Sequence, residues 1–457
     1  MLSCDTFALG KDFFKGGQNV LAKNSDRPVG EAQPLYFEKG GDHGAGEMLK
    51  CTHLTIPQAE HTYSVLGSKP YWIWGFEMGA NEKGLYIGNE AQGSRNAAES
   101  EEGMLGMDML RLALERAATA REAIDVIAGL LKTYGQNANA NVRYDRRYEN
   151  SYMIVDHEEI WVMETAGREW AARKAGKYAA ISNCYTIEDD YDLCSENMEQ
   201  LAREKKWISS AEKMNFAKAY TLPAARQSHS VPRCRRMNKL ISGFEIKPGF
   251  EEVYRVFRDH FEGELIEPRY GAGYANFISI CMHAQDSMSA QTAASMIFTY
   301  DDVLGKVFRY APSVPCCSVY IPVYWTESVP EILSSGRRYY DEESLWWSVE
   351  KLAMAVSIDE DQFGDAVRKE LRKLEKEIAD ATEKTEEEAR KLIASGDRKA
   401  AMEILNKLTE ESAVKLRDKA KELFVPIGEA LRKEGGIYGQ RKDFLEEYCE
   451  WARMSFI

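Results

Sequence analysis

A cysteine stands at position 4, in the run MLSCDTF, and the run LAKNSDRP follows from Leu21. A thiol becomes a strong nucleophile once a nearby base removes its proton. If the bond between Ser3 and Cys4 were cut, Cys4 would carry both a thiol and a free α-amine. An α-amine has a pKa of about 7.7–8.0, so it takes up a proton near neutral pH and can return it to a leaving group. Cys4 is therefore a candidate nucleophile with a built-in base, and it needs no catalytic histidine.

Two other interpretations of Cys4 follow from its position. One is a lipid attachment point, because a small residue, Ser3, precedes it. The start of the chain lacks the basic residues and the apolar stretch of about 7–15 residues that a secretory signal needs, which disfavours lipidation. The other interpretation is a small buried residue at the start of a strand. On its own residues, Cys4 leaves burial and nucleophilic catalysis both open.

Several kinds of chemistry lack their usual residue patterns. The sequence has no GxxxxGK[ST] phosphate loop and no GxGxxG run after a strand, so no nucleotide cofactor is expected. It also has no HExxH motif, and its seven histidines are dispersed. His53 and His61 are near in sequence, but surface or core roles explain them as well, so no metal site is predicted. A Ser–His–Asp triad stays open, because its members need not be close in sequence.

The composition bounds the class of protein. The chain has 457 residues, 44% of them hydrophobic, which is enough for a large core. Its 59 Lys and Arg against 73 Asp and Glu give a formal charge of -14, which disfavours nucleic acid and anionic membranes as partners. The sequence has no run of about 18 apolar residues, so no membrane span is predicted. The nine cysteines form no CxxC pair, so we expect reduced thiols and a cytoplasmic location.

Short strands with tight connections must hold Cys4. Residues 4–9 and 19–24 read as two strands joined through Gly16-Gly17, and a turn at Asn81–Gly84 joins two later ones. The pattern favours antiparallel sheet with helices outside it, an α+β protein. Further strands are predicted at 61–67, 71–79, 85–90, 151–156, 160–165, 168–173, 177–182, 276–284, 292–299 and 317–321. Helices are predicted around 104–114, at 119–135 after a capping box at Thr119, and at 197–206, 228–242 and 250–261.

The end of the chain has a different character. Beyond about residue 340 it reads as helical, and twenty of the thirty-six residues from 365 to 400 are charged. Apolar residues spaced alternately by four and three predict a helix–helix seam there, either within the chain or between copies. The seam consists of Val367, Leu371, Leu374, Ile378, Ala381 and Thr385. We therefore predict residues 1–3 as a propeptide, 4–340 as a hydrolase domain and 341–457 as a helical region.

Four blocks in order resemble one family. They are MLSCDTF, LAKNSDRP, WGFEMGANEKGLYIGNEA and AAISNCYTIEDDYDL, and the likeness runs over roughly residues 4–330. They resemble the N-terminal-nucleophile cysteine dipeptidases that include dipeptidase A and the secernins, and more distantly penicillin V acylase and bile salt hydrolase. The resemblance implies a four-layer αββα sandwich in which the nucleophile opens the first strand.

The resemblance also implies roles near the nucleophile. Cys4 matches the family's nucleophile, with Ser3 and Cys4 as the processing site. Asp26 matches the acid that holds the α-amine. Lys23 stands where the acylases have an arginine; the exchange keeps the charge but loses the planar fork, so the role of Lys23 is uncertain.

The remaining matches concern the oxyanion and the substrate. Asn89 matches a residue whose backbone N–H helps bind the oxyanion, and Asn183 matches the side-chain donor. Arg233 is the best match for a late arginine, with Arg236 nearly as good. Turn or strand-end roles are the plainer alternatives for the two asparagines.

Lys23 and three more residues are candidates for substrate binding. Trp74 alternates with other aromatic residues and either fills a strand core or walls a pocket. Glu77 and Glu90 either bind a substrate's ammonium group or form salt bridges.

Together these features predict a self-processed cysteine dipeptidase that cleaves small peptides through a Cys4 thioester, without a cofactor. The alternatives are an N-acyl amide hydrolase of the same fold and a non-enzymatic, secernin-like interaction protein. A homo-oligomer is expected from the resemblance.

Overall fold

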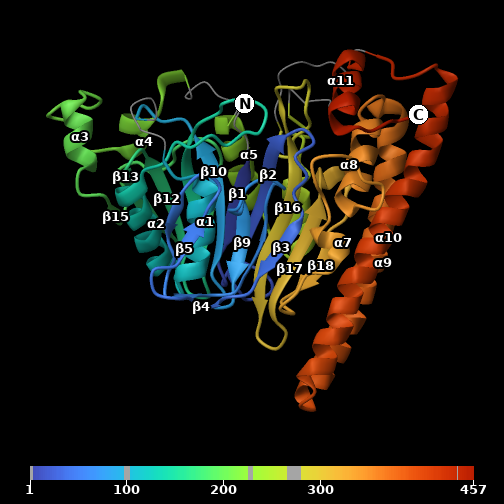
Figure 1. The fold of residues 1–457 in the computed structure, drawn as a ribbon, viewed down its shortest axis with the longest axis horizontal. Coiled ribbons are helices and arrows are strands. Elements are labelled where there is room, and N and C mark those ends of the chain that lie inside the picture. Colours follow the sequence, from blue (N-terminus) through green and yellow to red (C-terminus); the bar gives the residue numbers. More distant parts are fainter. Residues whose placement is uncertain (1–3, 97–102, 225–229, 265–278, 440) are drawn as a thin grey trace. The chain divides into compact units, whose positions relative to one another are not determined.

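The computed structural model describes residues 4–96, 103–224, 230–264, 279–439 and 441–457. The chain forms two compact units (Figure 1). The first, here called the N-terminal unit, contains Leu2–Lys23 and Phe37–Gly249. The second, the C-terminal unit, contains Asn24–Tyr36 and Phe250–Ile457. Among the described residues, no helix is long and apolar enough to cross a membrane.

An eight-stranded sheet forms the larger part of the N-terminal unit, in the order β15-β13-β12-β11-β10-β9-β8-β3. Its paired strands run antiparallel, as the short connections predict. The Asn81–Gly84 turn is confirmed: the Asn81 side chain accepts from Lys83 N and Leu85 N, and Gly84 takes a φ of 86°. The strands are β3 (Leu35–Glu38), β8 (Val65–Ser68), β9 (Met78–Asn81), β10 (Tyr86–Gln92), β11 (Glu149–Val155), β12 (Ile160–Ala166), β13 (Glu169–Ala175) and β15 (Leu193–Cys194).

Two helices, α1 (Gly106–Arg116) and α2 (Ala120–Tyr134), pack on this sheet, α1 over β9 and β10 and α2 over β11 to β13 (Figure 1). Thr119 caps α2 by accepting from Glu122 N, as its sequence predicts, and Gly135 ends the helix at a φ of 67°. The unit also contains the short helices α3 (Met198–Glu204) and α4 (Phe216–Tyr220) and the short strands β4 (Gly41–Asp42), β5 (Met48–Lys50), β6 (Thr55–Pro57) and β7 (His61–Thr62).

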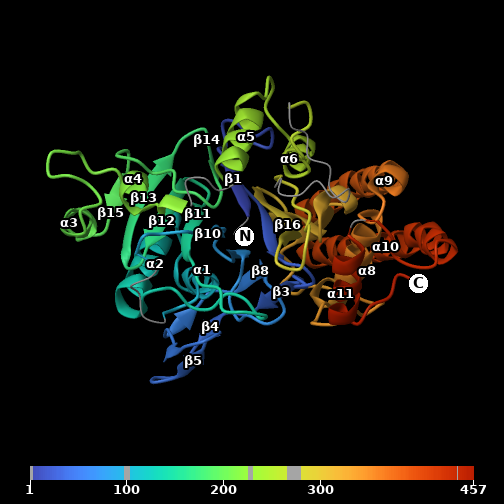
Figure 2. The ribbon, with the colours of Figure 1, turned by 90° about the horizontal axis from the view of Figure 1, so that it is seen from above.

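The strand that follows Cys4 belongs to a smaller sheet. β1 (Asp5–Leu9) lies between β14 (Tyr178–Ile181) and β2 (Val20–Pro28). All five residues of β1 are buried, which is typical of a strand covered on both faces. One cover is α5 (Ser230–Ser242), which lies beside β1 and β14 when the ribbon is seen from above (Figure 2). Strands β10 and β11 also contact β1.

The C-terminal unit begins with the second half of β2 and continues the order β2-β16-β17-β18. Its core strands are β16 (Ala290–Asp301), β17 (Gly305–Pro312) and β18 (Ile321–Tyr324). Its helices are α6 (Phe250–Phe257), the 3-10 turn η3 (Pro315–Cys317), α7 (Glu331–Ser334), α8 (Leu345–Val356), α9 (Glu360–Ala394), α10 (Arg398–Lys433) and α11 (Lys442–Ala452).

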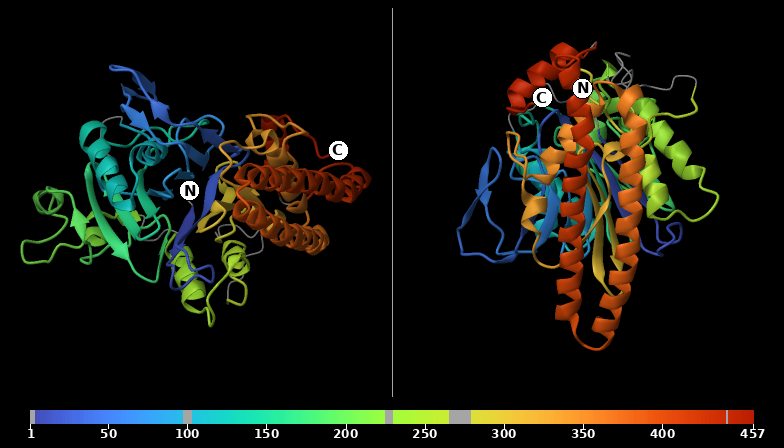
Figure 3. Two further views of the ribbon diagram at one scale, coloured as in Figure 1. Left: turned by 90° about the horizontal axis from the view of Figure 1, so that it is seen from below. Right: turned by 90° about the vertical axis from the view of Figure 1, so that its right-hand side faces the viewer.

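The charged helices α9 and α10 run antiparallel, side by side (Figure 3). All six seam positions on α9 are buried or half-buried: Val367, Leu371, Leu374 and Ile378 are buried, and Ala381 and Thr385 are half-buried. The seam residue Ala381 packs against a buried apolar cluster that includes Ala401 and Leu405 of α10 and Tyr324 of β18. The predicted seam therefore finds partners within this chain.

Four strand predictions differ from the structure. Residues 71–77 form turns and bends, and β9 starts only at Met78. Residues 279–284 are not a strand, while 276–278 lie outside the described residues. Cys317 ends the turn η3, so the strand predicted at 317–321 starts instead at Ile321. The strand predicted at 61–67 is interrupted between Thr62, where β7 ends, and Val65, where β8 begins, and β17 lies where no strand is predicted. These segments share a dense content of aromatic, proline or small residues, so periodicity alone could not separate a strand from a packed loop.

Candidate active site

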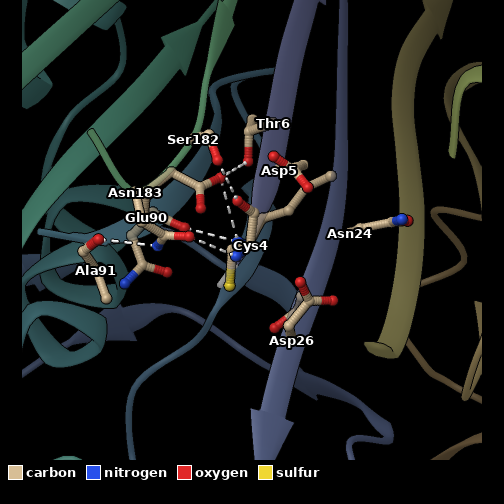
Figure 4. Close-up of polar contacts among 12 residues, drawn as sticks. Cys4, Asp5, Thr6, Asn24, Asp26, Glu90, Ala91, Ser182 and Asn183 are labelled. Atoms are coloured by element: carbon tan, nitrogen blue, oxygen red, sulfur yellow. Dashed lines mark hydrogen bonds and ion pairs between the residues drawn. The ribbon is translucent and has the colours of Figure 1, made fainter. Parts of the chain in front are cut away.

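Cys4 is buried, with 4% of its surface exposed, immediately before β1. Its backbone nitrogen donates a hydrogen bond to Asn183 Oδ1 at 2.9 Å (Figure 4). Its carbonyl oxygen accepts from Ser182 Oγ at 3.3 Å. Two neighbouring residues that follow β14 thus hold both backbone groups of the cysteine. Ser3, the other residue of the predicted processing site, lies outside the described residues.

Arg233 reaches the same point from α5. Its Nη2 donates to Asn183 Oδ1 at 2.7 Å, to Ser182 Oγ at 2.9 Å and to the Cys4 carbonyl at 3.4 Å. Its Nε lies 3.1 Å from Asp5 Oδ2. Arg233 is fully buried, whereas the alternative, Arg236, is only half-buried. The structure therefore brings Arg233, of the two arginines, to Cys4.

Sequence reasoning missed Asp5 and Ser182. Burial raises the pKa of Asp5 to about 6, although the Arg233 guanidinium opposes this by favouring the carboxylate. The ion pair orients the guanidinium, and Ser182 Oγ accepts from it and donates to Cys4. In the sequence, Asp5 is recognisable only as an acid directly after the cysteine. Its arginine partner lies 228 positions away, so the sequence does not indicate the ion pair.

Asn183 meets Cys4 as an acceptor. Its Nδ2 donates to the Ala91 carbonyl at 2.8 Å, while its Oδ1 accepts from both Cys4 N and Arg233. Since both Oδ1 contacts come from N–H donors, they fix which end of the amide faces the cysteine. Asn183 Nδ2, the donor predicted to bind the oxyanion, therefore already donates to the Ala91 backbone carbonyl.

Asn89 lies on β10, next to Glu90. Its backbone N–H donates to the Glu77 carbonyl at 3.3 Å, which is longer than the usual 2.9–3.0 Å. Its own carbonyl accepts from Lys23 Nζ at 2.6 Å. Glu77 is buried beside it, with 2% of its surface exposed.

Lys23 and Glu90 form a fully buried ion pair, with 3.6 Å between Lys23 Nζ and Glu90 Oε1. The same carboxylate oxygen accepts a short hydrogen bond from Thr6 Oγ1. The stem of Lys23 fits against Gly88, where an added Cβ would lie 3.0 Å from the lysine Cδ. Lys23 and Glu90 are thereby brought together as partners of each other, which matches the salt-bridge alternative for Glu90.

Asp26 belongs to the C-terminal unit, on the second half of β2. There its Oδ1 accepts from Thr292 Oγ1 of β16 at 2.6 Å. Its predicted contact with the α-amine of Cys4 stays a prediction.

Trp74 lies in the loop before β9, where the Arg111 guanidinium of α1 stacks over its ring at 4.1 Å. Arg111 also donates to the Trp74 carbonyl at 3.0 Å. These contacts anchor a half-buried indole to α1, and a role in lining a pocket stays a prediction.

Potential metal ligands gather in the C-terminal unit, where none was predicted. Four buried residues, His260, Cys281, His283 and Cys316, place one ligand atom each within 4.8 Å of all the others. The two histidines considered from sequence have other partners: His53 bonds the Asn139 carbonyl and His61 bonds Asp42. The local signal for the group was the Cys281-x-His283 spacing, which is too common to stand alone.

The geometry around Cys4 suits a nucleophile whose nitrogen is positioned by hydrogen bonding. The Arg233 guanidinium lies at the cysteine's backbone, 3.4 Å from the Cys4 carbonyl oxygen. The neutral acceptor Asn183 Oδ1 can hold the nitrogen whether it belongs to a peptide or to an amine.

Comparisons with known proteins place the chain among peptidases. It is 24% identical over 467 residues to a protein named probable dipeptidase B from Streptococcus pyogenes serotype M6, covering 90% of each chain, and equally so to the serotype M3 protein. Among solved structures, a mutant conjugated bile acid hydrolase from Clostridium perfringens aligns with 71% of this chain and 93% of its own. Its sequence identity is 13% and its TM-score is 0.41.

The family follows from the larger match. Residues 51–373, more than half of the chain, match the sequence profile of peptidase family C69. The protein belongs to peptidase family C69.

Proposed function

We propose that this peptidase is a dipeptidase in which Cys4 is the nucleophile. The observation that carries the proposal is the hydrogen bond from the buried Cys4 nitrogen to Asn183 Oδ1, at 2.9 Å. A cysteine kept only as core filler needs no buried arginine beside it, whereas Arg233 Nη2 lies 3.4 Å from the Cys4 carbonyl oxygen. Here the arginine of a separate helix joins the same cluster. The name of the Streptococcus pyogenes relatives supports dipeptides as the substrate class.

The base in this mechanism is the α-amine of Cys4 itself. It exists only after the Ser3–Cys4 bond is cut, and we propose that Cys4 cuts it. Its thiolate attacks the Ser3 carbonyl, the peptide shifts to a thioester as the C–N bond breaks, and water hydrolyses that thioester. The released amine takes up the proton that the nitrogen needs to leave.

Dipeptide cleavage then repeats the chemistry on a substrate. The α-amine accepts the thiol proton, and Sγ attacks the peptide carbonyl. The protonated α-amine of Cys4 then gives this proton to the leaving amine as the tetrahedral intermediate collapses. An acyl thioester remains on Cys4. The α-amine of Cys4 then deprotonates a water molecule, which hydrolyses the thioester and regenerates the thiol.

The negative charge on the intermediate's oxygen needs donors. We assign the Asn89 backbone N–H, whose present hydrogen bond is long, and Asn183 Nδ2. Asn183 Nδ2 would have to exchange the Ala91 carbonyl for the oxyanion. Each donor of this kind contributes about 10²–10³ in rate.

The other polar residues take supporting roles in the proposal. Arg233 orients Asn183 and stabilises the thiolate, and Asp26 holds the α-ammonium form. Lys23 pairs with Glu90 beneath Asn89 and holds its carbonyl, which keeps the Asn89 peptide in place. Glu77 and Trp74 remain candidates for contact with the substrate.

A four-layer αββα order is part of the proposal. Within the N-terminal unit, α1 and α2 contact the larger sheet, β1 and β14 contact β10 to β12 of that sheet, and α5 contacts β1 and β14. These contacts support the order helix, sheet, sheet, helix. The division at residue 340, a homo-oligomeric state and a cytoplasmic location stay predictions.

Intact mass and hydrolysis assays test the mechanism together. Wild-type protein should begin at Cys4 and hydrolyse dipeptides, while Cys4→Ala should keep Met1–Ser3 and be inactive. Cys234→Ala is the matched control, because Cys234 is another buried cysteine, next in sequence to Arg233 on α5. It should be processed and active.

Two outcomes would contradict the proposal. A wild-type chain that begins at Met1 and cleaves no dipeptide would overturn the mechanism. A processed chain that hydrolyses N-acyl amides but not dipeptides would leave the nucleophile in place and overturn the substrate class.

A further inference from the structure

We propose that His260, Cys281, His283 and Cys316 bind one Zn²⁺ ion that holds the C-terminal unit together. All four residues are buried, and each offers one ligand atom within 4.8 Å of the other three. Two thiolates with two imidazoles are a donor set typical of structural zinc. The proposal concerns a site separate from the Cys4 cluster and does not depend on the peptidase mechanism.

The three distances from His283 Nε2 to the other ligand atoms match a tetrahedron around zinc. With Zn–N of about 2.0–2.1 Å and Zn–S of about 2.3 Å, tetrahedral geometry separates two nitrogens by about 3.3 Å and a nitrogen from a sulfur by about 3.6 Å. His260 Nε2 and His283 Nε2 lie 3.2 Å apart. His283 Nε2 lies 3.6 Å from Cys281 Sγ and 3.3 Å from Cys316 Sγ. The three separations are thus already those of a coordination shell.

Hydrogen bonding explains this arrangement less well. His283 Nε2 faces three potential partners, His260, Cys281 and Cys316, at close range. A neutral imidazole nitrogen carries either one proton or one lone pair, so it serves one of them fully. A single cation at the centre of the group satisfies all four ligand atoms at once.

The surroundings of His260 fit a ligand. Its Nδ1 lies 3.1 Å from Glu262 Oε1, and its backbone N–H donates to Glu262 Oε2 at 2.8 Å. A carboxylate on one ring nitrogen holds the proton there and leaves the other nitrogen's lone pair facing the metal. Here that other nitrogen is Nε2, which points at the group.

The charge balance favours a divalent ion in a buried place. The four residues are between 0% and 8% exposed, so uncompensated thiolates there would be costly. Two thiolates neutralise one Zn²⁺, and binding releases their two thiol protons. With four protein ligands the shell is closed, which is typical of structural rather than catalytic zinc.

The ligands come from three stretches of chain. His260 follows α6, Cys281 and His283 precede β16, and Cys316 lies in η3. Cys281 N also donates to the Asp259 carbonyl at 3.1 Å, which ties the first two stretches. A zinc ion would cross-link all three stretches, which have little regular secondary structure of their own to order them.

Metal analysis of the purified full-length protein tests the proposal. After dialysis against metal-free buffer, wild-type protein should retain about one zinc per chain. Cys281→Ser and Cys316→Ser should each lower this at least tenfold. Cys317→Ser is the matched control: Cys317 is equally buried, next in sequence to Cys316, and outside the ligand group. It should keep its zinc.

X-ray absorption at the zinc edge on wild-type protein keeps the proposal testable if the serine variants fail to fold. It should show two sulfur and two nitrogen neighbours. Folded wild-type protein without bound metal would overturn the proposal, as would a Cys281–Cys316 disulfide in it. Another metal at one per chain would overturn the assignment to zinc, and zinc loss from Cys317→Ser equal to that from Cys316→Ser would overturn the ligand set.

Discussion

Arg233 Nη2 donates a hydrogen bond to Asn183 Oδ1 at 2.7 Å, and the same oxygen accepts from the nitrogen of Cys4 at 2.9 Å. The arginine on α5 therefore acts on the cysteine partly through the asparagine. In the proposed mechanism this guanidinium positions the nitrogen that would act as the base, and it favours the thiolate form of the nucleophile.

Replacing Arg233 by Lys should lower kcat about 10²-fold while leaving KM nearly unchanged. A lysine keeps a charge opposite Asp5 but cannot reach Asn183, Ser182 and the Cys4 carbonyl at once. Loss of that orientation misplaces the nucleophile, which costs rate rather than substrate binding. Steady-state kinetics on a dipeptide measure both constants.

Arg236→Lys is the control for this change, because it lies on the same helix and is half-buried. It should have wild-type kinetics. A kcat for Arg233→Lys within twofold of wild type would remove Arg233 from the mechanism.

Replacing Asn183 by Asp separates its two proposed roles. The variant keeps an acceptor for the Cys4 nitrogen but loses the Nδ2 donor. We expect processing to continue, with a chain that begins at Cys4, and kcat to fall about 10²–10³-fold. Intact mass and kcat report the two roles independently. An unchanged kcat would limit Asn183 to positioning the Cys4 nitrogen.

Replacing Lys23 by Met should strongly destabilise the protein. Glu90 would then be a buried carboxylate without its cation, which costs about 3–5 kcal/mol. The double variant Lys23→Met, Glu90→Gln should recover much of this loss, because it removes the orphaned charge as well. Urea unfolding of the single and double variants gives the coupling between the two side chains.

Lys11 and Glu158 form an exposed ion pair and provide the comparison. Lys11→Met should leave the unfolding midpoint unchanged within error, since exposed pairs contribute little. Equal effects of Lys23→Met and Lys11→Met would show that the buried pair is not needed for stability.

Replacing Glu149 by Gln should stabilise the protein more as the pH rises. Burial raises the pKa of Glu149 from 4.5 to about 7, partly offset by a hydrogen bond from Gly167 N. The folded state therefore binds this proton more tightly than the unfolded state does. The stabilisation of the folded state by this proton on Glu149 is complete below about pH 4.5 and is lost as the pH rises to about 7. The change in the free energy of unfolding is on the order of 3 kcal/mol.

Thermal unfolding between pH 4.5 and 8 measures this difference. The Tm of Glu149→Gln should match wild type at the acid end and exceed it at the alkaline end. Glu251→Gln, at an exposed position on α6, should show no such trend. If the difference in Tm between Glu149→Gln and wild type were the same at every pH, Glu149 would not be the group that binds this proton.

Local features were predictable from sequence. The strand after Cys4, the Asn81–Gly84 turn and the cap at Thr119 depend on residues within a few positions of each other. Such contacts form whatever the rest of the chain does, so residue type and spacing are enough to predict them. The loop at residues 71–77 failed this test, because its aromatic residues are placed by α1 and not by a strand period.

The sequence by itself determined that Cys4 opens a strand and that the region beyond about residue 340 is helical and highly charged. Only the tertiary structure decided which side chains meet that cysteine. Asn183 lies 179 positions away and Arg233 lies 229. The same holds for His260, Cys281, His283 and Cys316, which come together only when α6, the approach to β16 and η3 pack. Contacts over such separations depend on strand order and helix packing, which no local pattern encodes.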